Sequence, residues 1–334
     1  MDSPALAQPF SPIQRVRLPR YQRVAGYPEI WIGRPKQLIL EALGRFHYLT
    51  APQIARLAFS PTSLSYVRQH LSELYQAGYV NRLYLPVTRP CGSPLAVYCL
   101  DRKGLAYLRR SGEVPDGRFR PGEEGERSGT GLRHTLEAND FLILAHRLAR
   151  ERGDVSVAQM RTERELRRTP MRIGEGRRRI SLIPDGWVDL HLNGSDRMSL
   201  ALELDRGTHE RKSFQAKVRA YCEASAGEYQ KVFASASLSV LFVVTVGQGR
   251  LSQLLDWTKA ALRQDHGESY TDLFRFATID PTVADPGEVF FKPCWLRPFD
   301  EAPLPLMQSS PMVPEYETLS WPEVNHGILF TTPT

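Results

Sequence analysis

Three carboxylates with the residue types and spacing of metal ligands lie within one short stretch of the chain. Glu203 and Asp205 are two residues apart in a strand-like run, so their side chains point to the same face. Asp185 stands directly after Pro184 at the start of the preceding strand-like run and could supply a third carboxylate. Hard oxygen ligands gathered in this way suit Mg²⁺, which proteins commonly hold with one or two carboxylates plus waters and substrate phosphates. The stretch therefore predicts a metal site made by Asp185, Glu203 and Asp205.

The elements that must position these carboxylates are the two strands of a hairpin. Strand-like runs cover residues 187–192 and 198–204, and the turn between them begins with Asn193-Gly194, which is a strong hairpin signal. The leucines that alternate with the carboxylates in the second run should face a core.

A helix predicted over residues 210–223 follows the hairpin and carries Lys217 at the flank of its apolar stripe. The stem of this lysine can pack while its ammonium reaches the carboxylate cluster. Residues 238–246 then indicate a buried strand, 250–263 a further helix and 273–279 one more strand.

A helix and a basic segment precede the hairpin. The helix is predicted over residues 132–150, and Glu137 near its start could reach the metal site, although the helix dipole alone also favours an acid there. A strand at 155–160 leads into an arginine-dense segment that ends in Arg177, Arg178 and Arg179. A basic lip beside an acidic metal site suits a phosphodiester substrate, but such a cluster is otherwise a common solvated loop.

The first third of the chain has the pattern of a winged helix. Helices are predicted over residues 35–43, 51–57 and 61–77, the second with Thr50 as N-cap and the third ending at Gly78. Two strand-like runs at 79–86 and 95–100 follow, before a last helix that begins near Arg102. Three helices followed by a β-hairpin predict a winged helix over residues 34–110.

In such a fold the third helix enters the major groove of DNA. The polar residues that this helix is expected to expose are Ser63, Ser65, Tyr66, Arg68 and Gln69. Arg82 and Arg89 of the wing could contact the phosphate backbone. The alternative is a winged helix used for protein contacts, with these residues simply solvated.

The composition is that of a soluble globular protein with a basic excess. The 334 residues allow two domains, and the net charge of +6 favours a polyanionic partner without distinguishing nucleic acid from a membrane surface. The longest apolar run is too short to cross a bilayer, and the N-terminus lacks a signal-peptide core. The four cysteines show no zinc-ligand spacing, so we expect reduced thiols in the cytoplasm.

Changes in composition predict five segments. They are an irregular basic arm (1–33), the winged-helix domain (34–110), a flexible glycine-rich linker (111–131), a second domain (132–300) and a proline-rich tail (301–334). Trp295 and Trp321 are candidate anchors of the C-terminal region onto the main body.

The residues of the hairpin also carry a resemblance to a known motif. Pro184-Asp185, Glu203-Leu204-Asp205 and Lys217 resemble the PD-(D/E)XK motif of the restriction-endonuclease-like superfamily. Asp205 departs from the pattern because it occupies the position of the motif lysine. In several branches of the superfamily the lysine has moved onto the following helix, where Lys217 stands.

The wider sequence resembles the plasmid replication-relaxation family and the related MobC-type relaxases of mobilisable elements. The resemblance covers roughly residues 35–300 and implies an α/β fold, a winged helix followed by a restriction-endonuclease-like domain with a mixed central sheet flanked by helices. It further implies nicking of plasmid or transposon DNA at an origin of transfer or element end. Mg²⁺ or Mn²⁺ would be held by Asp185 and Glu203, with Asp205 as a further ligand or an orienting group and Lys217 steadying the phosphate.

Other functions remain compatible with these residues. One is a DNA-binding replication or transcription regulator that keeps an inactive nuclease fold, and another is the endonuclease subunit of a transposition machine, working with other mobilisation, replication or transposition proteins. A histidine-cluster relaxase is disfavoured because the chain contains no His-x-His pair. A covalent intermediate through Tyr221 is conceivable, but the sequence does not single out this tyrosine. No membrane partner is expected.

Overall fold

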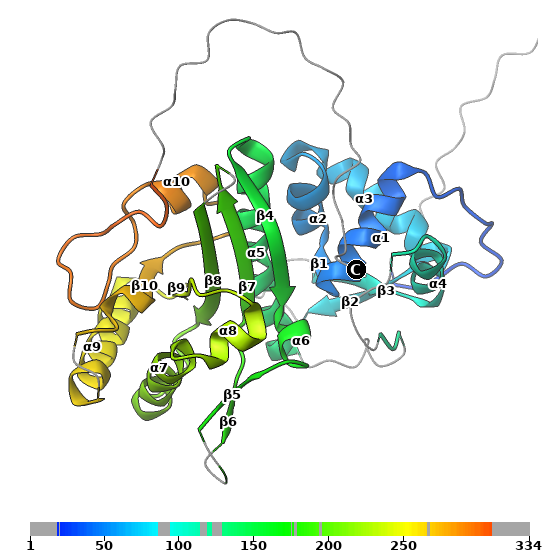
Figure 1. Ribbon diagram of the computed structural model, residues 1–334. Helices are drawn as coiled ribbons and strands as arrows, with labels where there is room; N and C mark the ends of the chain where they lie inside the picture. The colour runs from blue at the N-terminus through cyan, green and yellow to red at the C-terminus, as the bar shows by residue number, and fades with distance from the viewer. Residues whose placement is uncertain are drawn as a thin grey trace, which may run out of the picture.

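The computed structural model describes residues 19, 21–85, 94–113, 119–121, 129–174, 176, 179–193, 196–265 and 268–308. A mainly helical part with a small three-stranded sheet is followed by a larger part built on a five-stranded sheet, and the two lie side by side (Figure 1). The predicted fold class, a helical region followed by a mixed sheet with flanking helices, is confirmed.

The first part has the element order predicted for a winged helix. In chain order its elements are α1 (Arg34–Phe46), β1 (Leu49–Thr50), α2 (Ala51–Ala58), the 3-10 turn η1 (Pro61–Ser63), α3 (Leu64–Gln76), β2 (Val80–Leu85), β3 (Leu95–Leu100) and α4 (Arg102–Arg110). Strands β2 and β3 pair antiparallel as the wing, and β1 joins the far edge of β3.

Two local signals fix the helices of this part. The Thr50 side chain accepts a hydrogen bond from the backbone N–H of Gln53, and the Gln53 side chain accepts one from the backbone N–H of Thr50, which makes a capping box for α2. After α3 the chain turns at Gly78, whose φ of 80° lies in the left-handed region that favours glycine. The predicted N-cap and helix stop are both confirmed.

The second part contains the predicted elements and several shorter ones. In chain order they are α5 (Gly129–Glu151), β4 (Val155–Thr162), α6 (Glu163–Leu166), β5 (Met171–Ile173), β6 (Ile180–Leu182), β7 (Gly186–Leu192), β8 (Asp196–Asp205), α7 (Arg211–Ser225), α8 (Glu228–Phe233), β9 (Ser239–Val244), α9 (Gln248–Asp265), the 3-10 turn η4 (Thr271–Leu273), β10 (Phe274–Thr278) and α10 (Pro286–Phe291).

The five-stranded sheet has the order β10-β9-β8-β7-β4, antiparallel from β4 to β8 and parallel from β8 to β10. Helices α5 and α10 cover one face, and α7, α8 and α9 cover the other. Along β8 the leucines 200, 202 and 204 pack in the core under α5, while Ala201 packs in the core under α7. The alternation predicted for this strand is therefore confirmed.

The two parts pack directly against each other through α2 and α5. Gln53 donates to the carbonyl of Leu136 (2.7 Å), and Arg56 forms an ion pair with Asp140. Asn139 donates to the carbonyl of Tyr48 (3.0 Å), and one apolar core runs through both parts. This interface fixes the winged helix relative to the sheet, independently of the predicted linker, which is described only in part.

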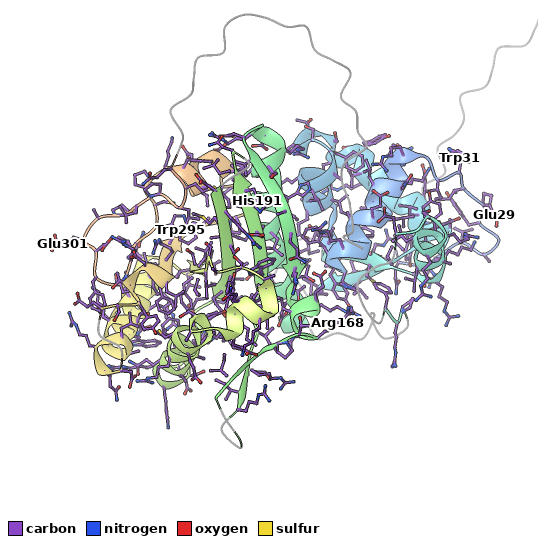
Figure 2. The ribbon with its side chains drawn as sticks, viewed as in Figure 1. Glu29, Trp31, Arg168, His191, Trp295 and Glu301 are labelled. Carbon is purple, nitrogen blue, oxygen red and sulfur yellow. The ribbon has the colours of Figure 1, made fainter. Side chains whose placement is uncertain are left out.

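Both ends of the described chain pack against these two parts. In the arm, Arg23 donates to the carbonyls of Tyr75 and Val80 (2.8 Å each) and pairs with Asp101 (2.6 Å). Near the other end, Trp295 is fully buried and donates to the carbonyl of Val289 (2.8 Å; Figure 2). Trp295 is thus an anchor as predicted, whereas Trp321 lies outside the described residues.

The arginine-dense segment contains α6 and a two-stranded antiparallel ribbon, β5 with β6, which the sequence did not predict. In the described part of the chain, no helix has both the length and the apolar character that crossing a bilayer requires.

Candidate active site

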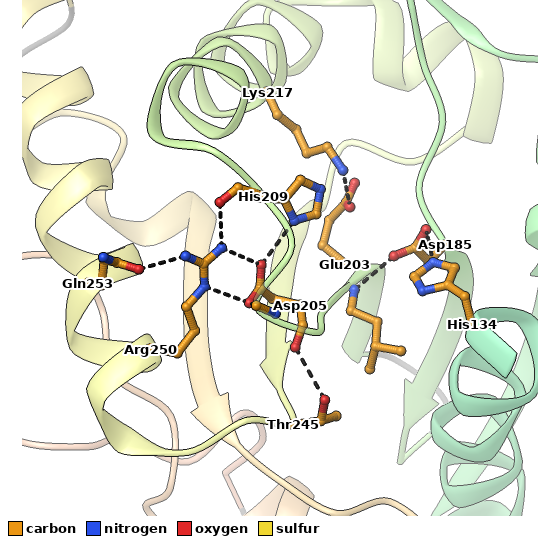
Figure 3. A network of polar contacts seen from close by, with 11 residues as sticks. His134, Asp185, Glu203, Asp205, His209, Lys217, Thr245, Arg250 and Gln253 are labelled. Carbon is orange, nitrogen blue, oxygen red and sulfur yellow. Dashed lines mark hydrogen bonds and ion pairs between the residues drawn. The ribbon is translucent and has the colours of Figure 1, made fainter. Parts of the chain in front are cut away.

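Asp185 and Glu203 lie side by side at one end of the central sheet. Strands β7 and β8 pair Gly186 with Leu202, so the next pair outward is Asp185 with Glu203. The backbone N–H of Asp185 donates to the carbonyl of Leu202 (2.9 Å), which continues the ladder to this position. Residues directly opposite on antiparallel strands have Cβ atoms about 5 Å apart. The hairpin thus brings the first two predicted ligands together, between Lys217 on α7 and His134 on α5 (Figure 3).

Glu203 is bound by two side chains from one face of α7. Lys217 Nζ lies 2.6 Å from Oε2, and the Tyr221 hydroxyl donates to Oε1 at 2.5 Å. These two residues are four apart, so the helix presents both toward the strand. Glu203 itself is only 2% exposed. The structure therefore brings Lys217 to the predicted site.

Burial and charge have opposite effects on this pair. Burial raises the pKa of Glu203 above its ordinary value, against the charge of Lys217, and the neighbouring charge of Asp185 adds to the increase. For Lys217, burial favours the neutral amine, but the charges of Glu203 and Asp185 outweigh it and raise its pKa. Lys217 therefore stays a cation beside the two carboxylates.

Asp185 is held by α5 and by the backbone of β8. His134 Nε2 lies 2.9 Å from Oδ1, and the backbone N–H of Leu204 donates to Oδ2 at 2.8 Å. Although burial opposes ionisation, the hydrogen bond and charge of His134 keep the pKa of Asp185 below its ordinary value. The same hydrogen bond raises the pKa of His134. No spacing in the sequence links His134 to Asp185, because α5 lies about fifty residues upstream.

Asp205 has a different environment from the other two carboxylates. Arg250 donates from Nε to Oδ1 (2.8 Å) and from Nη2 to Oδ2 (3.0 Å), and the backbone N–H of Gly207 donates to Oδ1 (2.8 Å). His209 Nδ1 lies 2.9 Å from Oδ2. Against burial, these contacts hold the pKa of Asp205 well below its ordinary range. Both oxygens of Asp205 therefore accept hydrogen bonds from the loop that follows β8 and from Arg250 of α9.

Glu137 lies one turn after His134 on α5 and pairs with Arg206, Nε to Oε2, at 3.0 Å. Burial raises its pKa despite the charge of Arg206. The structure thus places Glu137 in an ion pair beside the site.

The chemistry of the donor set decides how a metal would fit. Among the described residues, no group of three or more His, Cys, Asp or Glu side chains has the arrangement of a metal centre. Asp185 and Glu203 remain as an adjacent pair of hard oxygen donors, and Mg²⁺ commonly takes one or two carboxylates and completes its shell with waters and substrate phosphates. A two-carboxylate Mg²⁺ or Mn²⁺ site therefore fits the residues present.

The residues predicted to contact DNA are placed as follows. Ser65, Tyr66, Arg68 and Gln69 are exposed on α3, and Ser63 is half-buried at its start. Arg179 is exposed just before β6. Arg82 lies over the Tyr75 ring (4.1 Å to its centre), so part of its side chain is used within the fold. Arg89, Arg177 and Arg178 lie outside the described residues.

A family model described as Replication-relaxation matches residues 40–234, which is more than half of the chain and spans the winged helix, the hairpin and α7. No curated protein and no solved structure gave a significant match. The family description indicates a role in plasmid replication or relaxation, and hence interaction with DNA. The chain belongs to the replication-relaxation family.

Proposed function

We propose that the protein is a metal-dependent DNA endonuclease that nicks plasmid or mobile-element DNA at a specific site chosen by the winged helix. The observation that carries this proposal is the placement of Asp185, directly before β7, opposite Glu203 on β8, with Lys217 2.6 Å from Glu203. This is the arrangement implied by the motif resemblance, with the lysine supplied from α7.

In this proposal Asp185 and Glu203 hold Mg²⁺ or Mn²⁺. When bound, such an ion lowers the pKa of water and neutralises charge that develops on the phosphate. Asp205 is not among the ligands we propose, because Arg250 binds it bidentately and Gly207 and His209 add a second donor to each oxygen. Each oxygen of Asp185 and Glu203 has one such partner among the described residues. Asp205 instead sets the geometry of the loop after β8.

The other side chains of the site have separate tasks. Lys217 keeps its positive charge in a half-buried position next to the scissile phosphate, where it stabilises the transition state electrostatically. His134 and Tyr221 are positioning residues that hold Asp185 and Glu203.

Tyr221 is poorly suited to form a covalent bond with DNA. Its side chain is fully buried, and burial together with the charge of Glu203 raises its pKa well above the ordinary value. Because a nucleophilic phenol must reach the phosphate and lose its proton, we propose attack by water rather than by Tyr221.

The proposed partner is double-stranded DNA at an origin of transfer or element end. The exposed residues of α3, above all Arg68, would read the major groove, and Arg179 would contact phosphate near the cutting site. The packing of α2 on α5 supports a model in which the winged helix binds the site and the second part cuts it, because this packing holds α3 at a fixed distance from the carboxylates.

A catalytically inactive DNA-binding regulator is the second candidate. Two observations favour it: an acid stands at the position of the motif lysine, and Glu203 is already satisfied by Lys217 and Tyr221. A resident ion pair of this kind can stabilise a scaffold that no longer cuts.

Incubation of supercoiled plasmid carrying the element's origin region separates the two candidates. The nuclease proposal expects conversion to open circles with Mg²⁺ or Mn²⁺, blocked by a chelator, and primer extension that stops at one position on one strand. Specific binding without any nicking under either metal would support the regulator.

A further inference from the structure

The ribbon of β5 and β6 projects from the second part beyond α6 and α7 (Figure 1). Its inner face is apolar: Met171, Ile173 and Leu182 are buried in the core that also contains α7 and α8. The ribbon is therefore seated on the body of the protein along one face.

Hydrogen bonds from the ribbon backbone to two glutamates of the second part add to this seating. The backbone N–H of Arg172 donates to Glu228 Oε1 (3.2 Å), and that of Gly174 donates to Glu223 Oε1 (2.9 Å). Two carboxylates, one near the end of α7 and one at the start of α8, thus hold β5 in place on the second part.

The outer face of the ribbon is basic. Arg172 and Ser181 are cross-strand partners, and Arg172 Nη1 donates to Ser181 Oγ at 2.9 Å. Two arginines that flank the ribbon are also exposed: Arg168, two residues after α6 (Figure 2), and Arg179, directly before β6. Within the described part of the chain, no carboxylate side chain forms an ion pair with any of these three arginines. Their guanidinium groups are available to an anionic ligand.

The basic ribbon is directly connected to the proposed catalytic carboxylates along the chain. Strand β6 ends at Leu182, and only Ile183 and Pro184 separate it from Asp185. Of the outer residues, Ser181 stands four and Arg179 six residues before Asp185, which corresponds to at most about 14 Å and about 22 Å of extended chain. A phosphate on the outer face of the ribbon would therefore lie within a few nucleotides of one held at Asp185.

We propose that Arg172 and Ser181 on the outer face of the ribbon, together with the flanking residues Arg168 and Arg179, bind the phosphate backbone of duplex DNA beside the nick site. The inference rests on the proposed function in that Asp185 marks the place of cutting. Arginine side chains and a hydroxyl are typical phosphate contacts, which fix register and orientation without reading bases. The winged helix then selects the site, and the ribbon aligns the strand to be cut.

The test compares Arg172→Ala, Arg172→Lys and the double variant Arg172→Ala/Arg179→Ala in binding to an origin duplex over a range of salt concentrations. Each lost phosphate contact should reduce by about 0.9 the steepness with which the logarithm of the DNA-binding constant falls with the logarithm of the salt concentration. The slope for the double variant should therefore be shallower by about 2 than that of the wild type. Arg172→Lys should keep most of the slope. Lys292→Ala serves as the matched control, because Lys292 is an exposed cation that follows α10, under the opposite face of the sheet.

Footprinting of the same complexes locates the contact. The double variant should lose backbone protection within about half a helical turn of the nick, while protection over the winged-helix site persists. An unchanged salt slope, or a loss of protection only at the winged-helix site, would overturn the inference. If the slope and the footprint change as expected but wild-type protein never nicks, the ribbon contact stands and the proposed nuclease function fails.

Discussion

Arg250 holds Asp205 by two parallel hydrogen bonds, from Nε to Oδ1 (2.8 Å) and from Nη2 to Oδ2 (3.0 Å). Bidentate pairs of this type are among the strong hydrogen bonds that carboxylates form in proteins. The acid at the position of the motif lysine is therefore neutralised from α9. Lys217 remains as the cation that contacts Glu203.

Loss of Arg250 should destabilise the fold. Arg250→Ala leaves Asp205, which is 1% exposed, as a buried charge without its main partner, and the expected loss is about 3–5 kcal/mol in free energy of unfolding. Urea denaturation measures it. The double variant Asp205→Asn/Arg250→Ala should recover part of that loss; strictly additive effects of the two substitutions would contradict the pairing.

Tyr221→Phe tests whether the hydroxyl positions Glu203 or attacks DNA. Removal of the hydrogen bond to Glu203 Oε1 should lower the nicking rate by about tenfold, as is usual for groups that orient metal ligands. The same nicked product should still form. The measurement is the single-turnover nicking rate together with denaturing gels for protein–DNA adducts. A covalent adduct in wild-type protein that disappears in Tyr221→Phe would refute the positioning role.

The stability of the protein should fall in mild acid because of His146 on α5. Burial, with the charges of Arg45 and Arg150, lowers the pKa of His146 from 6.5 to about 4. As the pH falls, His146 is protonated in the unfolded chain before it is protonated in the folded protein. The free energy of unfolding is therefore highest above pH 6.5 and decreases by up to about 3 kcal/mol as the pH falls toward 4. Unfolding curves at several pH values should show a flatter profile for His146→Gln. Equal acid sensitivity of the variant and wild type would show that His146 is not responsible.

Arg68→Ala should weaken binding of the cognate duplex by about 1–3 kcal/mol, because Arg68 is exposed on the helix expected in the major groove. Anisotropy titrations at physiological salt measure this, with Lys292→Ala as the exposed control. Unchanged affinity for DNA would point to a winged helix that binds protein instead.

Much of the fold was predictable because its signals are local. The alternation along β8, the capping box at Thr50 and the turn at Gly78 each depend on neighbouring residues, and each is confirmed. The ribbon of β5 and β6 was missed because strands of three residues are too short to show a period of two.

The site was only partly predictable for a related reason. The spacing of Asp185, Glu203 and Lys217 within one hairpin and its following helix made their proximity foreseeable. His134 and Arg250 come from helices far away in the sequence, and no local pattern connects them to their carboxylates. The environment of Asp205 was unforeseeable for the same reason.

The most direct test of the proposed active site is nicking of supercoiled origin DNA by Glu203→Gln, an isosteric change that removes one carboxylate and keeps partners for Lys217 and Tyr221. DNA affinity and urea stability are measured on the same preparations, with Lys292→Ala as control. The account predicts that nicking in Mg²⁺ falls by at least about a hundredfold while affinity for the duplex and the folded state are retained. Nicking at the wild-type rate by folded Glu203→Gln would contradict the assignment of this site.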